Sequence, residues 1–326
     1  MSTADANPEV PWLERRVLVT GGAGFLGRRV VHRLRELGAV VTAPRSSEYD
    51  LTVPGRADAM LADLQPSLVI HLAADVGGIG YNLEHPARLY LANLLMGTHV
   101  IEAARNAGID KTVLLGTVCS YPKFTPVPFA EGDLWNGYPE ETNAPYGIAK
   151  KAHLIHAQVN EQQYGQRFAY LIPTNLYGPG DKFHPSVSHV IPALIKKCVE
   201  AKESGADHVD VWGTGSASRE YLYVDDAADA IVRAAEVHVG AEPINLGADR
   251  EVTIRETVET IARLVEFDGE LRWDPSKPDG QPRRGVDGTR AGELLGWKPS
   301  MDFETGLRLT IDWYLAHRAE AERAPH

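Results

Sequence analysis

The chain has 326 residues, of which 44% are hydrophobic, and a formal net charge of −11 at pH 7. This length and composition fit a globular protein with one large domain or two smaller ones, and the negative charge argues against a nucleic-acid partner. The two cysteines, Cys119 and Cys198, are too few for a disulfide framework, so we expect a reducing compartment.

We expect no targeting signal at the N-terminus. Residues 1–14 are polar and contain proline, without the apolar stretch of a secretory signal peptide, and residues 1–12 look like a loose arm. No apolar run elsewhere approaches the length of a membrane span. We therefore expect a cytoplasmic protein without a membrane partner.

A glycine-rich turn between a strand and a helix is the first strong motif. The apolar residues 16–20 predict a strand, and Gly21, Gly24 and Gly27 follow it, before apolar residues at helical spacing. In dinucleotide-binding folds the first glycine allows the tight turn, the second lets the backbone approach a pyrophosphate, and the third lets the helix pack on the strand. The helix N-terminus then faces the phosphates. An ordinary glycine-rich turn is the alternative, and the strand–glycine–helix context favours the dinucleotide site.

The end of the second strand indicates which dinucleotide is bound. Residues 40–43 predict that strand, and Pro44, Arg45 and Ser46 follow it. An acidic residue here would bind the ribose diol of NAD, whereas an arginine accommodates the 2′-phosphate of NADP. Arg45 and Ser46, with Arg28 as a helper, therefore favour NADP; an arginine in a solvated turn is the alternative.

Strands and helices continue to alternate through the first half of the chain. Further strands are predicted at 68–74, 113–119, 167–172 and 243–247, and long helices over 86–107 and 143–164. This alternation is typical of an α/β protein with a Rossmann-type, doubly wound parallel sheet.

A smaller α/β region is expected to hold the substrate. After Tyr177 the segments become shorter and richer in proline, glycine and histidine, and residues 219–235 look like a return to the sheet domain. We assign residues 1–176 and 220–247 to an NADP-binding Rossmann domain, and residues 177–219 and 248–326 to a C-terminal substrate-binding domain. Helices are predicted over 254–265 and 303–315, and the charged tail after His317 is expected to fray.

A tyrosine and a lysine lie one helical turn apart in the predicted helix 143–164. The i, i+4 spacing puts Tyr146 and Lys150 on one face. An ammonium near a phenol favours the phenolate and lowers the pKa of the phenol, so such a tyrosine can donate a proton to a carbonyl oxygen near neutral pH. Thr117, at the end of a predicted strand, can share that oxygen. A tyrosine and a lysine that only share a helix surface are the alternative, and the glycine motif favours the catalytic interpretation.

These motifs resemble the extended short-chain dehydrogenase/reductase family and, within it, the GDP-L-fucose synthase family. The closer resemblance is carried by residues 76–79 (VGGI), 119–123 (CSYPK), 173–179 (PTNLYGP) and 183–194 (FHPSVSHVIPAL). It extends from about Arg16 to about Tyr314. It implies an NADPH-dependent enzyme that epimerises a nucleotide-linked 4-keto-6-deoxy sugar at C3 and C5 and then reduces C4.

The resemblance also implies roles for individual side chains. Thr117, Tyr146 and Lys150 fall on the hydroxyl–Tyr–Lys triad of the reductases, and Cys119 and His189 on the base and acid of epimerisation. The residues implied in NADP(H) binding are Gly21, Ala23, Gly24, Phe25, Leu26, Gly27, Arg28, Arg45, Ser46, Asp50, Leu51, Ala73, Ala74, Tyr146, Lys150, Pro173, Asn175 and Leu176. Those implied in substrate binding are Val76, Gly77, Asn175, His189, Lys197, Trp212, Arg219, Lys277 and Asp279.

Two positions depart from the family pattern. Thr117 stands where better-known members have serine, and it keeps the hydroxyl. Ala23 stands where some members have an arginine that reaches the cofactor phosphate, which leaves the selection of NADP to Arg45 and Arg28. Residues 118–119 occupy the places of the carboxylate pair that a dehydratase of this fold needs, which argues against elimination.

Two alternatives stay open. One is an epimerase of another GDP- or nucleotide-linked ketosugar, acting at one or two centres with or without reduction. The more remote one is a non-catalytic sensor that binds NADP. No metal is expected, because the histidines and cysteines lack ligand spacing. From the resemblance, helices 86–107 and 143–164 are expected to pair across a two-fold axis in a homodimer.

Overall fold

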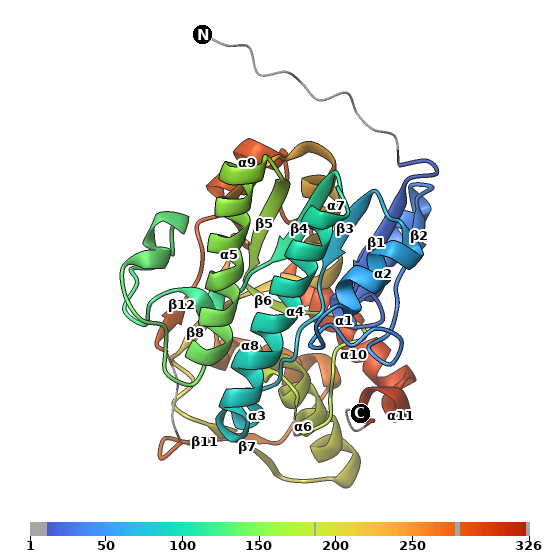
Figure 1. Ribbon diagram of the computed structural model, residues 1–326. Coiled ribbons are helices and arrows are strands. Elements are labelled where there is room, and N and C mark those ends of the chain that lie inside the picture. Colours follow the sequence, from blue (N-terminus) through green and yellow to red (C-terminus); the bar gives the residue numbers. More distant parts are fainter. Residues whose placement is uncertain (1–11, 186, 278–280, 324–326) are drawn as a thin grey trace.

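A six-stranded parallel sheet forms the larger part of the molecule (Figure 1). The computed structural model describes residues 12–185, 187–277 and 281–323. The sheet has the order β2-β1-β3-β4-β5-β9, and every neighbouring pair is parallel. Its strands are β1 (Arg16–Thr20), β2 (Val40–Thr42), β3 (Leu68–His71), β4 (Lys111–Leu115), β5 (Arg167–Pro173) and β9 (Gly240–Leu246). The predicted Rossmann-type α/β fold is confirmed.

Helices cover both faces of this sheet. The helices α1 (Phe25–Glu36) and α7 (Val224–Val237) lie on one face, and α2 (Arg56–Leu64), α4 (Pro86–Asn106) and α5 (Ala144–Tyr164) on the other. The short helix α3 (Ile79–Glu84) precedes α4. The two long helices predicted from the sequence are thus α4 and α5. Within the described residues, no helix has the length and apolar character needed to cross a membrane.

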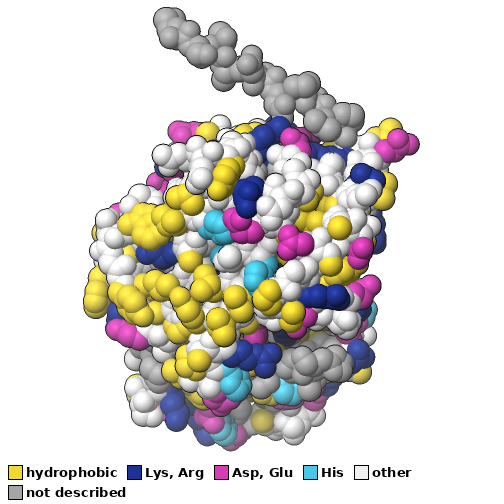
Figure 2. All heavy atoms as spheres, viewed as in Figure 1, with side chains coloured by type: hydrophobic (Ala, Val, Ile, Leu, Met, Phe, Trp, Pro, Cys, Tyr) yellow, Lys and Arg dark blue, Asp and Glu magenta, His cyan; other side chains and the backbone are white. Residues whose placement is uncertain are grey.

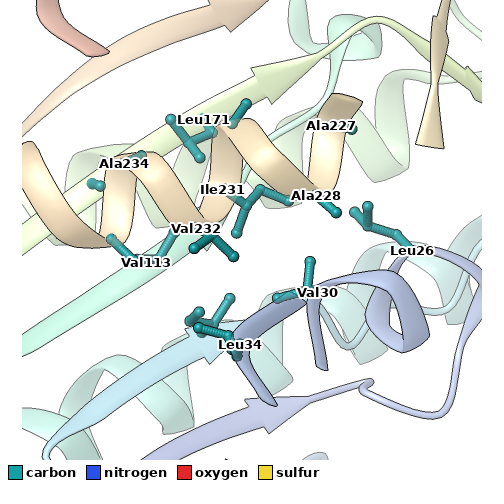
Figure 3. Close-up of a cluster of buried hydrophobic side chains, with 14 of the residues drawn as sticks. Leu26, Val30, Leu34, Val113, Leu171, Ala227, Ala228, Ile231, Val232 and Ala234 are labelled. Carbon is teal, nitrogen blue, oxygen red and sulfur yellow. The ribbon is translucent and has the colours of Figure 1, made fainter. Parts of the chain in front are cut away.

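Alternate strand residues pack under the two helical layers. In β1, Val19 belongs to the cluster shared with α1 and α7, whereas Leu18 belongs to the cluster under α2 and α4. Figure 3 shows the first cluster, where Val30 of α1 and Ile231 of α7 point toward each other; Leu171 of the sheet belongs to the same cluster. Burying each such side chain stabilises the fold by roughly 1.5–3 kcal/mol. The packing of α1 against α7 and the sheet therefore holds the first turn of α1 in place.

The smaller part of the molecule has its own core. A sheet of order β10-β8-β12, with β6 also paired to β8, and a two-stranded sheet of β7 and β11 are covered by helices. The strands are β6 (Asn175–Tyr177), β7 (His208–Trp212), β8 (Ser218–Tyr223), β10 (Glu251–Thr253), β11 (Glu270–Asp274) and β12 (Arg283–Arg284). The helices are α6 (Val190–Ser204), α8 (Ile254–Val265), α10 (Phe303–Ala316) and α11 (Arg318–Ala321). The helix α9 (Thr289–Leu295) packs instead on the core of the main sheet, next to α7 and β9. The 3₁₀ turns η1 (Val118–Ser120) and η2 (Glu131–Trp135) follow β4.

Two features of the second half were not predicted from the sequence. Residues 218–223 form β8, which pairs with β6, β10 and β12 instead of joining the main sheet, so the chain returns to that sheet only with α7. The tail does not fray directly after His317: Ala321 is buried, and its carbonyl accepts a hydrogen bond from the N–H of Phe183 (3.0 Å). Both features depend on tertiary contacts that local composition does not reveal. The two-domain boundaries themselves stay a prediction.

The order of the sheet places a crevice at the carboxyl ends of β1 and β3. From β1 the chain goes first to β2 on one side and then to β3 on the other side. In open α/β sheets, ligands bind outside the carboxyl ends of the strands at such a change of direction. The predicted glycine motif follows β1, and Ala73 follows β3, so both lie at this crevice.

Candidate functional site

The glycine motif forms a turn that only glycine fits. Gly21 has φ of 70°, and a Cβ on it would lie 2.7 Å from the backbone nitrogen of Ala73. A Cβ on Gly27 would collide with the carbonyl oxygen of Gly21, so the missing side chain lets α1 pack on the turn. No side chain among the described residues caps the start of α1, which leaves its first N–H groups available for an anion. This cradle fits the pyrophosphate of a dinucleotide.

The end of β2 lies beside this turn. A Cβ on Gly22 would lie 2.6 Å from the Cβ of Ala43, and Arg45 and Ser46 follow in an exposed turn. The N–H of Arg45 donates to Oε2 of Glu48 (2.7 Å), which holds the turn. Arg45 and Ser46 therefore have the position and the exposure that residues binding a 2′-phosphate need.

Arg28 is engaged elsewhere. Its guanidinium donates to the carbonyl of Gly180 (3.1 Å) and to Oε1 of Glu320 in α11 (3.0 Å). These contacts tie α1 to the C-terminal part of the chain. The expected help of Arg28 in cofactor binding stays a prediction.

Thr117 and Cys119 follow β4, next to β3 in the sheet. Thr117 begins η1, and its Oγ1 accepts a hydrogen bond from the N–H of Cys119 (3.2 Å). The hydroxyl proton of Thr117 is thus left for another acceptor. Cys119 is partly exposed and is not in a disulfide.

The predicted face of α5 meets η1. Lys150 is buried, and its Nζ lies 5.8 Å from the centroid of the Tyr146 ring. Between them, Gly147 approaches Cys119 so closely that a Cβ on it would collide with the Cys119 carbonyl oxygen. Oγ of Ser120 donates to the carbonyl of Gly147 (3.0 Å). The structure therefore places the backbone of Cys119 against α5 between Tyr146 and Lys150, and the charge of Cys119 acts on the Tyr146 phenol.

The electrostatics of this pair differ from the sequence prediction. Burial, and secondly the charge of Cys119, raise the pKa of Tyr146 above its usual value, whereas Lys150 was expected to lower it. Burial also lowers the pKa of Lys150 to about 8. The prediction failed because removing both groups from water disfavours their charged forms, and the ammonium faces the ring of Tyr146 at 5.8 Å.

Two buried histidines near Lys150 were missed. Nδ1 of His71 lies 2.7 Å from Oγ1 of Thr20, and Nε2 of His153 lies 3.2 Å from the carbonyl oxygen of Leu94. Burial first, and the charge of Lys150 second, lower the pKa of both imidazoles, that of His153 to about 3. The imidazoles of His71 and His153 near Lys150 are therefore neutral. The sequence holds no signal for them, because the strand and helix positions involved are set by packing.

His189 lies at the N-terminus of α6, where it faces Asp181. Nδ1 of His189 is 4.0 Å from Oδ1 of Asp181, which is buried, and Oδ2 of Asp181 has no hydrogen-bond partner among the described residues. Burial lowers the pKa of His189, but the hydrogen bond and charge of Asp181 outweigh it, so the pKa is raised. About half of the imidazole is exposed, so the carboxylate of Asp181 has more effect on this pKa than burial. Asp181 was not predicted.

The loop after β3 lies beside His189. A Cβ on Gly78 would lie 2.7 Å from the carbonyl oxygen of Ser188, and Asp75 is held by Asn93, whose Oδ1 accepts from the Asp75 N–H (3.1 Å). Val76 and Gly77, expected at the substrate, lie between these anchors. The structure thus brings them to the same side of the crevice as the imidazole.

Three of the expected substrate residues meet at the edge of β7. Trp212 is 63% exposed, and the Nζ atoms of Lys197 and Lys277 lie 5.8 and 5.7 Å from its ring centroid. Two cations around an exposed indole can bind an anionic group next to a flat ring. Asp279 lies outside the described residues. On β8, Nη1 of Arg219 donates to the carbonyl of Gln281 (2.7 Å).

Comparison with known proteins agrees with this geometry. The profile of the "NAD dependent epimerase/dehydratase family" matches residues 17–247. GDP-L-fucose synthase 1 of Arabidopsis thaliana is 42% identical over 301 residues, covering 92% of this chain and 93% of that protein. GDP-L-fucose synthase of Escherichia coli K12 is 38% identical, covering 94% and 98%. The chain belongs to the GDP-L-fucose synthase family.

A solved structure supports the same placement. A GDP-L-fucose synthetase from Naegleria fowleri bound to NADP is 29% identical to this family member, with a TM-score of 0.87 and 95% of each chain covered. The predicted membership of the extended short-chain dehydrogenase/reductases is thus confirmed. The roles of individual residues stay predictions.

Several expected cofactor residues of this GDP-L-fucose synthase family member also have structural contacts. Leu51 is buried and its carbonyl oxygen lies 2.8 Å from Nδ1 of His99; Oδ1 of Asp50 accepts from the N–H of Thr52 (3.0 Å). Nδ2 of Asn175 donates to the carbonyl of Glu220 (3.1 Å). Other positions expected at the cofactor, Ala23, Phe25, Leu26, Ala74, Pro173 and Leu176, lie in the glycine turn and α1, just after β3, or at β5 and β6. The expectation of no metal stays a prediction.

Replacing Asp181 should lower the pKa of His189. In Asp181→Asn the carboxylate no longer offsets burial, so the imidazole should lose its proton at lower pH; NMR titration of the His189 ring measures this. Lys182→Gln is the control, because the charge of Lys182 lowers the pKa of His189 and its loss should move the titration the opposite way. A His189 titration unchanged by Asp181→Asn would contradict the assignment.

The raised pKa of His189 also makes the free energy of unfolding depend on pH. Because the folded pKa of His189 lies above 6.5, its contribution to the free energy of unfolding is present below the unfolded value and is lost as pH rises through the folded value. Asp181→Asn should remove this pH dependence.

Proposed function

We propose that this protein is an NADPH-dependent GDP-L-fucose synthase. It epimerises GDP-4-keto-6-deoxy-D-mannose at C3 and C5 and reduces C4 to give GDP-L-fucose. The observation that carries the proposal is the contact of Gly147 with Cys119, which holds a thiol beside Tyr146 and Lys150 at the carboxyl end of the sheet. The 42% identity to an Arabidopsis GDP-L-fucose synthase supports it.

Epimerisation begins with loss of a proton next to the C4 carbonyl. The Cys119 thiolate takes the proton from C3 or C5, the C–H bond breaks, and its electron pair forms an enolate with the charge on O4. Tyr146 and Thr117 donate hydrogen bonds to that oxygen; each such donor is worth roughly 3–4 kcal/mol in an oxyanion hole. The hydrogen bond that Thr117 accepts from the Cys119 N–H directs its own proton outward.

Inversion is completed from the opposite face. The His189 imidazolium returns a proton to the carbon, and Asp181, 4.0 Å away, favours the protonated ring. Once water has taken the proton from the Cys119 thiol and returned one to the His189 imidazole, the same exchange at the second carbon inverts that centre as well. When bound at the glycine turn, NADPH would supply the hydride for C4. Tyr146, kept as a neutral phenol by burial, donates the proton to O4.

The cofactor is NADPH, held by the glycine turn and Arg45. The turn binds the pyrophosphate with the N-terminus of α1, and the exposed Arg45 and Ser46 bind the 2′-phosphate. The NADP-bound relative of 29% identity supports this choice. At the other end, Lys197 and Lys277 beside Trp212 bind the diphosphate and the base of the nucleotide sugar.

A second candidate is the same chemistry on another GDP-linked ketosugar. GDP-L-colitose synthase of Yersinia pseudotuberculosis is 33% identical and covers 92% of this chain, so the binding frame can serve a different sugar. Product analysis with each ketosugar in heavy water separates the two. A non-catalytic sensor is disfavoured, since Thr117, Cys119, Tyr146 and Lys150 lie together.

We also propose a homodimer through α4 and α5. The two helices pack closely, since a Cβ on Gly97 of α4 would collide with the ring of His153 of α5. Their outer surface is apolar: Tyr90, Leu91, Ile155 and Val159 are all exposed, and hydrophobic side chains form a band across this view in Figure 2. Covering this band is what a two-fold partner would do. We also propose that the enzyme works in the cytoplasm, because two cysteines suit a reducing compartment.

Deuterium uptake and NADPH oxidation test the main proposal. With GDP-4-keto-6-deoxy-D-mannose in heavy water, the protein should incorporate deuterium at C3 and C5 and oxidise NADPH. Cys119→Ser should lower deuterium uptake by about 10²–10⁴-fold while part of the reduction survives, and Tyr146→Phe should slow NADPH oxidation at least about a hundredfold. Tyr164→Phe, at the exposed end of the same helix, serves as control. Equal loss of both activities in Cys119→Ser would contradict a separate base.

The cofactor preference can be reversed at one position. Arg45→Glu should shift the ratio of kcat/KM from NADPH toward NADH, because a carboxylate repels the 2′-phosphate and binds a ribose diol. Arg56→Glu is the control: that guanidinium already donates to the carbonyl of Glu48 (2.6 Å). A ratio that does not move in Arg45→Glu would place the 2′-phosphate elsewhere.

Charges in the apolar band should prevent pairing. The double variant Ile155→Glu, Val159→Glu should run as a monomer in size-exclusion chromatography with light scattering, where the unaltered protein runs as a dimer. Leu309→Glu, an exposed leucine on α10, should leave the mass unchanged. A monomeric unaltered protein would refute the dimer.

A further inference from the structure

One cation faces the thiol of Cys119. Nη1 of Arg284 lies 3.8 Å from Sγ of Cys119, although the two residues are 165 positions apart in the chain. Arg284 is half-buried in β12, and among the described residues no carboxylate lies within 4.0 Å of its guanidinium. Its charge is therefore available to an anion at the sulfur position.

The neighbouring arginine shows the contrast. Arg283 is exposed, and its guanidinium forms a bidentate pair with Glu251 of β10 (2.5 and 3.0 Å). Successive strand residues point to opposite faces of a sheet, so one arginine of β12 neutralises a carboxylate while the other turns to the thiol. The charge of Arg283 is therefore neutralised by Glu251, whereas that of Arg284 acts on the Cys119 sulfur.

Gln281 fixes the guanidinium in place. Its Oε1 accepts from Nε and Nη2 of Arg284 (3.2 and 3.1 Å), and its Nε2 donates to the carbonyl of Lys123 (3.0 Å). Lys123 follows Cys119 in the same loop. The glutamine thus joins the arginine to the segment that carries the thiol and leaves Nη1 directed at the sulfur.

We propose that Arg284 is the positioning residue that holds Cys119 as a thiolate, the form that accepts a proton. A thiolate beside an arginine is more populated and therefore more reactive near neutral pH. When the sulfur takes the proton from the sugar carbon, the S–H bond forms, the C–H pair moves to the enolate, and the thiol becomes neutral. The catalytic part of this assignment rests on the proposed function, whereas the thiolate itself can be measured without substrate.

Alkylation by iodoacetamide tests the thiolate directly. Cys198 is fully buried, so mass spectrometry of the native protein reports the rate at Cys119. At pH 7, Arg284→Gln should slow alkylation by about tenfold, and Arg284→Lys should recover part of the rate. Arg283→Gln should match the unaltered protein. An unchanged rate in Arg284→Gln would overturn the proposal.

Turnover separates this role from substrate binding. Arg284→Gln should lower kcat for deuterium uptake at C3 and C5 by at least about tenfold, with the loss recovered as pH is raised. A rise in KM alone, with normal alkylation, would make Arg284 a substrate ligand and overturn the proposal. If Arg284→Gln does not fold, Gln281→Leu, which frees the guanidinium, should slow alkylation in the same direction, and an unchanged rate there would equally overturn it. Failure of the unaltered protein to turn over any ketosugar would defeat the proposed function and leave the alkylation result to decide on Arg284.

Discussion

The close approach of η1 to α5 is the contact on which the site depends. Without a side chain, Gly147 lets the Cys119 carbonyl reach the helix, and Ser120 locks the approach by donating to the Gly147 carbonyl (3.0 Å). Tyr146 and Lys150 lie on either side of that glycine. The segment after β4 that carries the thiol and the helix that carries the phenol are therefore held together, next to the crevice at the carboxyl ends of β1 and β3.

Burial decides the protonation states of Tyr146 and Lys150, whereas Cys119 and His189 each face one charged side chain. Desolvation keeps the Tyr146 phenol protonated and lowers the pKa of Lys150 to about 8. The two groups assigned to proton transfer at carbon each face a charge from another segment: Arg284 faces Cys119, and Asp181 faces His189. Under the proposed function, this arrangement prepares a base and an acid separately, as inversion at a carbon requires.

Much of the fold could be predicted because it follows from local sequence patterns. The glycine turn, the apolar strands and the two long helices follow from short-range spacing, and all are present. Arg284 escaped prediction because its role arises from pairing of distant segments, since it lies 165 positions from Cys119. Asp181 is close to His189 in the sequence, but it lies in an irregular loop whose course short-range spacing does not predict. The pKa of Tyr146 was predicted in the wrong direction, since spacing gives the neighbour but not the degree of burial. The placement of β8 in the small sheet was missed for the same reason as the arginine.

The most direct test is a structure of the protein with NADP and GDP-L-fucose bound together. The account predicts O4 of the sugar within hydrogen-bond distance of the Tyr146 hydroxyl and Thr117 Oγ1, with the Cys119 sulfur and the His189 imidazole on opposite faces of the sugar ring. A sugar bound away from Tyr146, or a sulfur and imidazole on the same face, would contradict it.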